Sequence, residues 1–432
     1  MIRERLRHLG GHALVRRSAL FSLSIGAATI VGVFTIPVLV GVLGASTWGV
    51  LAVLQALAAF FGFLIAFGWG ATGPAHVAGL PAEERRQFYW DSVVTRGILF
   101  VLLVPVAVLI GSAITSLPVL TVTLAILAYT LPGAGAGWYF VGTNQPGRMF
   151  LLDSLPPIAG TVAGLIAVIA VPSLDMFLVA MVACEAIGFA VATIVVLAST
   201  HGPVRWWLGA SRLFGAYRGQ VPGMASSVAA SFYTSAPAVI VQMFAPREVP
   251  VYAIADRLFR YAVLVLAPIL QSIQSWVPEA GRTEAVARSR QVVWLSVGIG
   301  VVGMAGLIGF APLVSNWLTH GEAIVPWVLA ILIGIAFAGE AVSQVTGLSS
   351  LVALGAARYL AASSVVCAIA GSTGILLLTP FWGAVGAFLA IACASVVLAL
   401  FRARRTLSLA AAAQALAEAG SAARREERES DA

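Results

Sequence analysis

Long apolar runs, separated by short polar segments, dominate the chain between Leu20 and Phe401. The runs show no alternation of apolar and polar residues, so they do not match the roughly 10-residue strands of a membrane β-barrel. Most are about 20 residues long, which is the length of an α-helix that crosses a bilayer. Because main-chain groups in lipid need internal hydrogen-bond partners, the pattern predicts membrane-spanning helices.

Twelve such helices are predicted, so the expected fold class is an all-α polytopic membrane protein with two pseudo-symmetric six-helix bundles. The apolar runs place them at 18–44, 48–68, 92–114, 117–140, 150–172, 176–198, 222–245, 250–275, 292–313, 324–350, 358–379 and 383–402. The first run exceeds the 7–15 apolar residues typical of a signal peptide, so we expect a retained helix. The expected regions are an N-terminal bundle (1–200), a cytoplasmic amphipathic linker (201–220), a C-terminal bundle (221–405) and a disordered cytoplasmic tail (406–432).

The two halves of the chain have similar sequences. Arg148 through Gly164 reads RMFLLDSLPPIAGTVAG, and Arg358 through Gly374, 210 positions later, reads RYLAASSVVCAIAGSTG. Pro37 and Pro237 lie in the middle of the first and seventh helices. An even number of helices in each half gives both copies the same orientation, which is the repeat arrangement of several transporter folds. The alternative is a chance match between two Ala- and Gly-rich segments.

Charge is scarce and unevenly placed. Charged residues make up 10% of the 432 residues, and apolar residues 60%, whereas soluble domains carry about 25% charged residues. All 25 basic residues are arginines, and the net charge is +7. They lie mostly in short loops, which argues against nucleic acid as a partner. With the N-terminus inside, all but Arg247, Arg257 and Arg260 fall in inner segments, which predicts that both termini are cytoplasmic.

The sequence lacks the motifs of the common membrane enzymes and of metal sites. Cys184, Cys367 and Cys393 lie in apolar runs without paired spacing, so we expect neither a metal site nor a disulfide. There is no HExxH, GxSxG or P-loop motif, so ATP hydrolysis by this chain is not expected. No catalytic residues and no cofactor are predicted.

The richest candidate site is in the eighth helix, within VYAIADRLFRYAV. Asp256 and Arg260 are four residues apart, so they lie on one helix face and can pair. With Arg257 the cluster has two cations and one anion. Guanidinium groups bind phosphate oxygens with two parallel hydrogen bonds, which predicts a phosphate-binding site. The alternative is an internal salt bridge near the membrane surface.

Other candidates are polar groups and prolines inside apolar helices. Glu340 and Glu185 could bind a coupling proton or cation, because ionisable groups in a membrane are expensive and often functional; the alternative is a hydrogen-bonded structural carboxylate. Gln55 is a candidate cavity-lining group for substrate. Pro37 and Pro237 are expected to kink their helices and to act as hinges, or else to kink them only for packing.

Three segments resemble the polysaccharide and lipid-linked oligosaccharide flippases, the O-antigen or Wzx-like type, of the multidrug/oligosaccharidyl-lipid/polysaccharide exporter superfamily. The segments are LPGAGAGWYFVGTNQPGRMFLLD (131–153), SFYTSAPAVIVQMFAPREVPVYAIADRLFRYAVLVLAPILQSIQSWVPEA (231–280) and STWGVLAVLQALAAFFGFLIAFGWGATGPA (46–75). The resemblance implies two lobes around a cationic cavity and alternating access driven by an ion or membrane gradient. It also implies a lipid-linked oligosaccharide substrate in a bacterial inner membrane, with Arg257 and Arg260 at the family's basic positions.

Three other functions remain open at this stage. A cation-coupled multidrug exporter of the same superfamily would need an acidic site without much positive charge, which the arginines of the eighth helix disfavour. A lipid II flippase commonly has fourteen helices, against the twelve predicted here. A membrane enzyme that processes glycans would usually need a sizeable outer loop, and all outer loops are predicted to be short.

Overall fold

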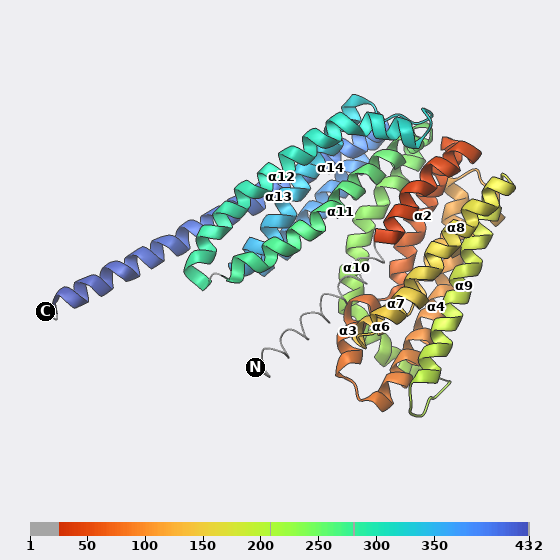
Figure 1. Cartoon of the computed structure of the whole chain (residues 1–432), viewed down its shortest axis with the longest axis horizontal. Coiled ribbons are helices and arrows are strands. Elements are labelled where there is room, and N and C mark those ends of the chain that lie inside the picture. The colour runs from red at the N-terminus through yellow and green to blue at the C-terminus, as the bar shows by residue number, and fades with distance from the viewer. Residues whose placement is uncertain (1–25, 208, 280, 431–432) are drawn as a thin grey trace, which may run out of the picture. The chain divides into compact units, whose positions relative to one another are not determined.

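The computed structural model describes residues 26–207, 209–279 and 281–430, and these form helices joined by short connections (Figure 1). The first half contains a helix at Gly26–Leu43, then α2 (Ala45–Ala66), α3 (Trp69–Gly79), α4 (Ala82–Ile114), α5 (Val119–Thr130), α6 (Gly137–Gly142), α7 (Pro146–Met149), α8 (Leu155–Ala170) and α9 (Leu174–Ser199). The second half contains α10 (Ala210–Phe244), α11 (Val249–Glu279), α12 (Gly281–Leu318), α13 (Trp327–Val345) and α14 (Ala357–Ser430). Short 3-10 or π turns adjoin them: η1 (Leu131–Ala134), η2 (Phe150–Ser154), η3 (Pro246–Glu248) and η4 (Thr346–Leu351).

Within the described residues, nine helical stretches are long and apolar enough to cross a membrane. The last of them, Arg358–Ala415, has 58 residues and is kinked at Gly383, where φ is 53°, so it contains two crossings. The more polar helices α10 and α11 complete the twelve. The chain is therefore an all-α multi-pass membrane protein, as its apolar pattern predicts.

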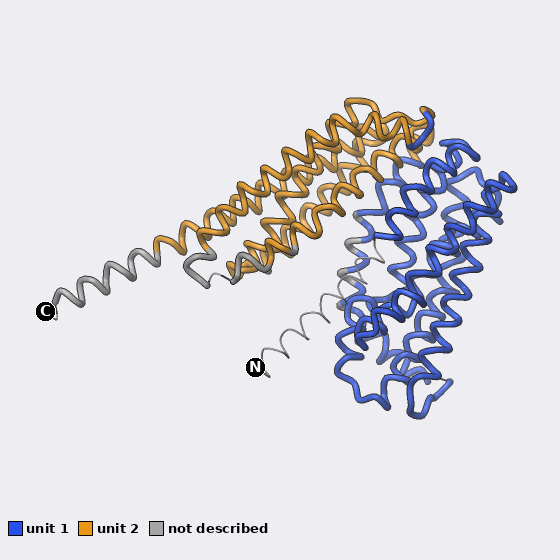
Figure 2. Tube along the Cα trace, in the orientation of Figure 1, with its two compact units in different colours: residues 1–242, 318–320 blue, residues 243–317, 321–432 orange. Residues whose placement is uncertain are grey.

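The chain divides into two compact units (Figure 2). Unit 1 comprises Met1–Gln242 with Leu318–His320, and unit 2 comprises Met243–Trp317 with Gly321–Ala432. Most of α10 thus belongs to unit 1, whereas the sequence places the boundary in a 201–220 linker. The second part of that linker is already helix, because α10 begins at Ala210.

Side chains of α4 hold the connection between α9 and α10 within unit 1. The amide of Gln87 accepts a hydrogen bond from the main-chain N–H of Arg205 at 2.6 Å. Asp91 accepts hydrogen bonds from both Nε and Nη2 of Arg212, with a shortest distance of 2.8 Å. The indole of Trp90 donates to the carbonyl of Trp206 at 3.0 Å. These hydrogen bonds attach the connection to α4 within unit 1.

The C-terminal segment that we expected to be disordered is helical, because α14 continues to Ser430. Residues 406–432 contain mostly Ala, Leu, Glu and Arg, which are strong helix formers, and only one glycine. The Ala-rich and then charged composition that led to the expectation of disorder is therefore compatible with the helix that the structure shows to Ser430.

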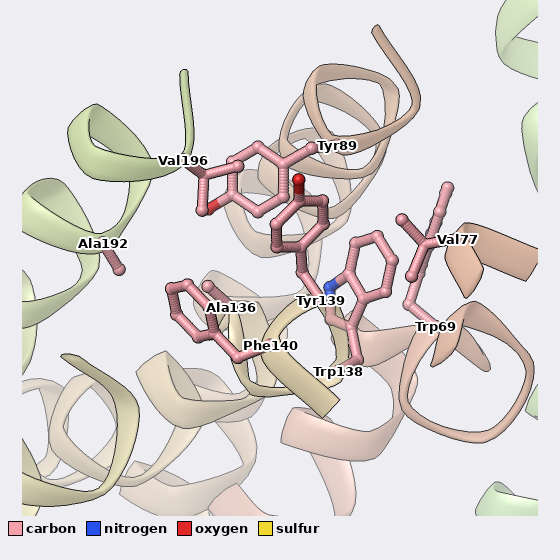
Figure 3. Close-up of a cluster of buried hydrophobic side chains, with 9 residues drawn as sticks. All are labelled: Trp69, Val77, Tyr89, Ala136, Trp138, Tyr139, Phe140, Ala192 and Val196. Atoms are coloured by element: carbon pink, nitrogen blue, oxygen red, sulfur yellow. The ribbon is translucent and has the colours of Figure 1, made fainter. Parts of the chain in front are cut away.

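A cluster of aromatic side chains joins α3, α4 and α6 in unit 1 (Figure 3). The ring of Trp138 lies 5.2 Å from that of Trp69 and 6.2 Å from that of Tyr89, measured between centroids. Tyr139 lies 5.2 Å from Tyr89 in an edge-to-face arrangement. Aromatic pairs of this kind add about 0.5–1.5 kcal/mol beyond the area that they bury. The cluster fixes the short helix α6 against its neighbours.

Candidate functional site

The charged cluster of α11 has the geometry that its spacing predicts. Nε of Arg260 lies 2.6 Å from Oδ2 of Asp256, one helical turn away. The Arg260 side chain is 41% exposed and that of Asp256 is 19% exposed, so the guanidinium remains accessible while paired. Arg257, which follows Asp256 in the chain, is half-buried.

Apolar side chains of α11 fix this helix within unit 2. Leu266 packs against Phe337 of α13, and Tyr252 lies 5.3 Å from the ring of Phe388 in α14. These apolar contacts orient one side of the helix into the unit. Arg260 is exposed on α11, and an exposed charge in a membrane helix requires water, another polar group or a lipid headgroup.

Glu340 belongs to a polar cluster in unit 2 that the sequence revealed only in part. Its Oε1 accepts a hydrogen bond of 2.6 Å from Nε2 of Gln344, one turn along α13. Nearby, Arg402 is 6% exposed and donates to the carbonyl of Ser343 at 3.1 Å. We counted Arg402 among the cytoplasmic arginines because it follows the last apolar run, and its side of the membrane stays a prediction. Its burial was not predicted: its hydrogen bonds bridge α13 and the two parts of α14.

Glu185 is buried in α9 of unit 1, with 7% of its surface exposed. Within the described part of the chain its Oε1 has no hydrogen-bond partner. A buried carboxylate oxygen without a partner is costly when charged, which fits a group that takes up a proton. Glu185 and Glu340 belong to different units, so they do not form one carboxylate pair within either unit.

The remaining predicted residues are also in unit 1. Gln55 is half-buried in α2, so the predicted substrate-binding set is divided between a unit that holds Gln55 and a unit that holds Arg257, Arg260 and Asp256. Pro37 is half-buried, and its carbonyl accepts a hydrogen bond of 3.1 Å from Nε2 of His320. Pro237 is buried in α10. Their role as hinges stays a prediction.

The sequence did not predict a cavity of about 360 Å³ inside unit 1. Its lining includes Arg96 of α4, Trp138 of α6 and Asp153 of η2. Arg96 is 1% exposed, although we counted it, as a borderline case, among the inner-loop arginines. An arginine close to the middle of a 33-residue helix was the signal that could have revealed the site.

The cavity lies beside a break in the helical path between η1 and α6. Pro132 lacks an N–H, and the surrounding glycines allow close approach: a Cβ on Gly133 would lie 3.0 Å from Cα of Gly62 in α2. Nη1 of Arg96 donates to the carbonyl of Gly135 at 2.6 Å. Oδ1 of Asp153 accepts from the N–H of Gly137 at 2.7 Å. One cation and one anion thus satisfy main-chain groups on the two sides of the break.

Comparisons with known proteins give information about the fold. No protein-family model matches the chain, and no curated protein matches its sequence. The lipid II flippase MurJ in an inward closed conformation superposes with a TM-score of 0.62 at 11% identity, over 92% of this chain and 90% of that chain. An inward-facing multidrug resistance MATE family transporter of the MOP superfamily gives 0.57 at 15%, over 93% and 99%.

A mutant of the Vibrio cholerae MATE transporter VcmN gives a TM-score of 0.54 at 14% identity, over 92% of this chain and 98% of that chain. At these identities the likeness is one of fold and spans nearly the whole of each chain. The chain therefore has the fold shared by the MurJ flippase and the MATE transporters.

Proposed function

We propose that the chain is a transporter of the MOP superfamily that flips a polyprenyl-pyrophosphate-linked oligosaccharide to the outer leaflet of the bacterial inner membrane, for cell-surface polysaccharide synthesis. Both termini would be cytoplasmic. The observation that carries the proposal is the α11 cluster, in which Arg260 is accessible although it pairs with Asp256. With Arg257 the cluster has an excess of positive charge, and guanidinium groups suit the oxygens of a pyrophosphate.

The fold alone does not separate this function from its alternatives, because a lipid II flippase and multidrug transporters share it. Charge is what favours an anionic lipid-linked substrate over a cationic drug, since two arginines in one membrane helix would repel a cation. In the proposed complex Arg257 and Arg260 hold the pyrophosphate, while Asp256 orients Arg260. Gln55 would contribute a polar contact to the sugar, and the prenyl tail would stay among the membrane lipids.

Alternating access requires elements that change shape and a source of energy. Pro37 and Pro237 interrupt main-chain hydrogen bonding in their helices, which makes them the proposed hinges. The proposed energy source is a gradient of protons or another cation that binds at Glu340 or Glu185. The unsatisfied Oε1 of Glu185 supports a proton at that position, whereas Glu340 already accepts a hydrogen bond from Gln344.

We expect Glu185→Gln or Glu340→Gln to remove the dependence of flipping on an ion gradient. Glutamine keeps the shape of glutamate but cannot exchange a proton, so a coupling site would be lost. The measurement is transport in reconstituted vesicles with and without an imposed pH or sodium gradient. Glu84→Gln, at an exposed carboxylate in the first turn of α4, is the control. If both of the first two variants respond to the gradient as the native protein does, neither carboxylate couples transport.

A drug-efflux assay separates the proposal from its main rival. The chain and a known multidrug transporter should be expressed in parallel in a host that is sensitive to cationic dyes. We expect the known transporter to lower dye accumulation and this chain to leave it unchanged, because the α11 arginines disfavour cations. Gradient-dependent efflux of dye by this chain, lost in the Glu340→Gln variant, would instead identify a cation-coupled multidrug exporter.

A further inference from the structure

The unit 1 cavity is separate from the α11 cluster, and its shape and chemistry point to a ligand of its own. Irregular backbone at membrane depth occurs only where it is covered by protein or lines a water-filled cavity. The break between η1 and α6 meets that condition, because Gly133, Gly135 and Gly137 line the cavity. A volume of about 360 Å³ is at the lower end of the range of small-molecule pockets.

The charges of the lining cancel. Among the described residues that surround the cavity, Arg96 is the one cation and Asp153 the one anion. The hydrogen bonds of Arg96 go to Ser92 and to the carbonyls of Gly133 and Gly135 rather than to a carboxylate. An anionic ligand would gain from Arg96 but would be repelled by Asp153, and a cationic ligand would meet the reverse. The lining therefore favours a neutral ligand.

The remaining hydrogen-bonding groups favour a ligand with hydroxyls. Asp153 is half-buried and contributes to the lining, so its carboxylate can accept a hydrogen bond from a ligand. A hydroxyl supplies such a donor and carries no charge. Tyr129 and Phe63 add aromatic surface to the same lining, which suits the apolar face of a ring.

We propose that this cavity binds a single neutral sugar ring. The inference rests on the proposed function in one respect, namely that the sugar would be one unit of the transported glycan. Asp153 accepts a hydrogen bond from a ring hydroxyl, the indole ring of Trp138 adds aromatic surface, and the guanidinium of Arg96 stays fixed by main-chain carbonyls at the edge of the sugar ring. The aromatic cluster of Figure 3 holds Trp138 in place, since the centroids of the Trp69 and Tyr89 rings lie 5.2 and 6.2 Å from that of its own ring.

Gly70 offers a way to fill the cavity without disturbing its walls. It lines the cavity, and a Cβ at this position meets no atom within 4 Å. Gly79, in the same helix α3, also has no atom within 4 Å of its Cβ, but it does not line the cavity. Gly70→Leu and Gly79→Leu carry the same change in helix propensity and added surface, so the second variant is a matched control.

The test measures binding of glucose, galactose and mannose to the purified full-length chain in detergent, by saturation-transfer NMR and titration. Each sugar is compared with its uronic acid and its 2-amino counterpart, which keep the ring and change the charge. We expect at least one neutral sugar to bind more tightly than its charged counterparts. Gly70→Leu should weaken that binding roughly tenfold or more, equivalent to about 1.4 kcal/mol, while Gly79→Leu leaves it unchanged.

Three outcomes would overturn the proposal: no binding of any neutral sugar, tighter binding of a charged counterpart, or equal binding by the native chain and Gly70→Leu. Binding is measured without transport, so the result is independent of the proposed function. If a neutral sugar binds as expected but the chain moves no lipid-linked glycan, the cavity assignment stands and the flippase proposal fails. If the chain moves a lipid-linked glycan but binds no neutral sugar, the flippase proposal stands and the cavity assignment fails.

Discussion

Replacing Arg260 with alanine is expected to abolish glycan export while the protein still reaches the membrane in normal amount. A hydrogen bond to a charged group contributes about 1.5–3 kcal/mol, so losing one pyrophosphate contact predicts a roughly 10- to 150-fold loss of substrate affinity. Arg260→Lys keeps the charge but loses the two-pronged geometry, and should be partly active. Surface glycan and membrane abundance, measured in the same cells, give the result.

Two further variants distinguish substrate binding from a structural role of Arg260. Arg247→Ala removes an exposed arginine from η3 of the same unit and should export normally. The double variant Asp256→Ala with Arg260→Ala removes both members of the 2.6 Å ion pair. If Arg260 binds substrate, the double variant stays inactive. Normal export by the double variant would mean that Arg260 is only the partner of Asp256, and the proposed pyrophosphate site would be wrong.

Replacing Arg96 with methionine should destabilise unit 1 strongly. The change leaves the carbonyl of Gly135 without its 2.6 Å donor and leaves Asp153 without a nearby cation. A buried group that loses its hydrogen-bond partner typically costs about 1–3 kcal/mol, and Arg96 has several such partners. Because Met approximates the length of Arg, the loss would reflect charge and hydrogen bonds more than volume. The measurement is unfolding of the purified protein in detergent, followed by heat or denaturant.

Arg148→Met is the matched control, because Arg148 is exposed and its hydrogen bonds go to the side chains of Gln145 and Ser199. Surface substitutions of this kind usually change stability by less than about 0.5 kcal/mol. Arg96→Lys should be intermediate, since an ammonium keeps the charge but cannot reach Ser92 and Gly135 with the same fork. Equal unfolding of Arg96→Met and Arg148→Met would show that Arg96 does not hold the helix break together.

The fold could be predicted because a bilayer imposes one strong rule on sequence. A run of apolar residues about 20 long must be a helix there, and the predicted helix at 176–198 is observed as α9 (Leu174–Ser199). The helix predicted at 117–140 shows the limit of this rule. It is broken after Ala134, because the main-chain groups of the break find partners on Arg96 and Asp153. Hydropathy does not reveal partners that lie 39 and 16 residues away in the chain.

The part of the site that could be predicted involves residues that are close together in the sequence. The four-residue spacing of Asp256 and Arg260 predicts their contact, and the structure confirms it. The burial of Arg402 was not predicted, for the opposite reason. Its position at the end of an apolar run resembles that of a loop arginine, and only the packing of α13 against α14 shows that Ser343 and Ser363 surround it. Burial of a charge depends on tertiary contacts, which a single sequence does not specify.

Leaflet exchange of the substrate in reconstituted vesicles tests the central claim most directly. A fluorescent polyprenyl-pyrophosphate oligosaccharide is placed in both leaflets, and a membrane-impermeant quencher reports the fraction that becomes accessible with time. We expect the native chain to bring the inner pool to the outer surface, Arg247→Ala to do the same, and Arg260→Ala to leave the inner pool protected. Equal protection of the inner pool with the native chain and with empty vesicles, under every imposed gradient, would contradict the account.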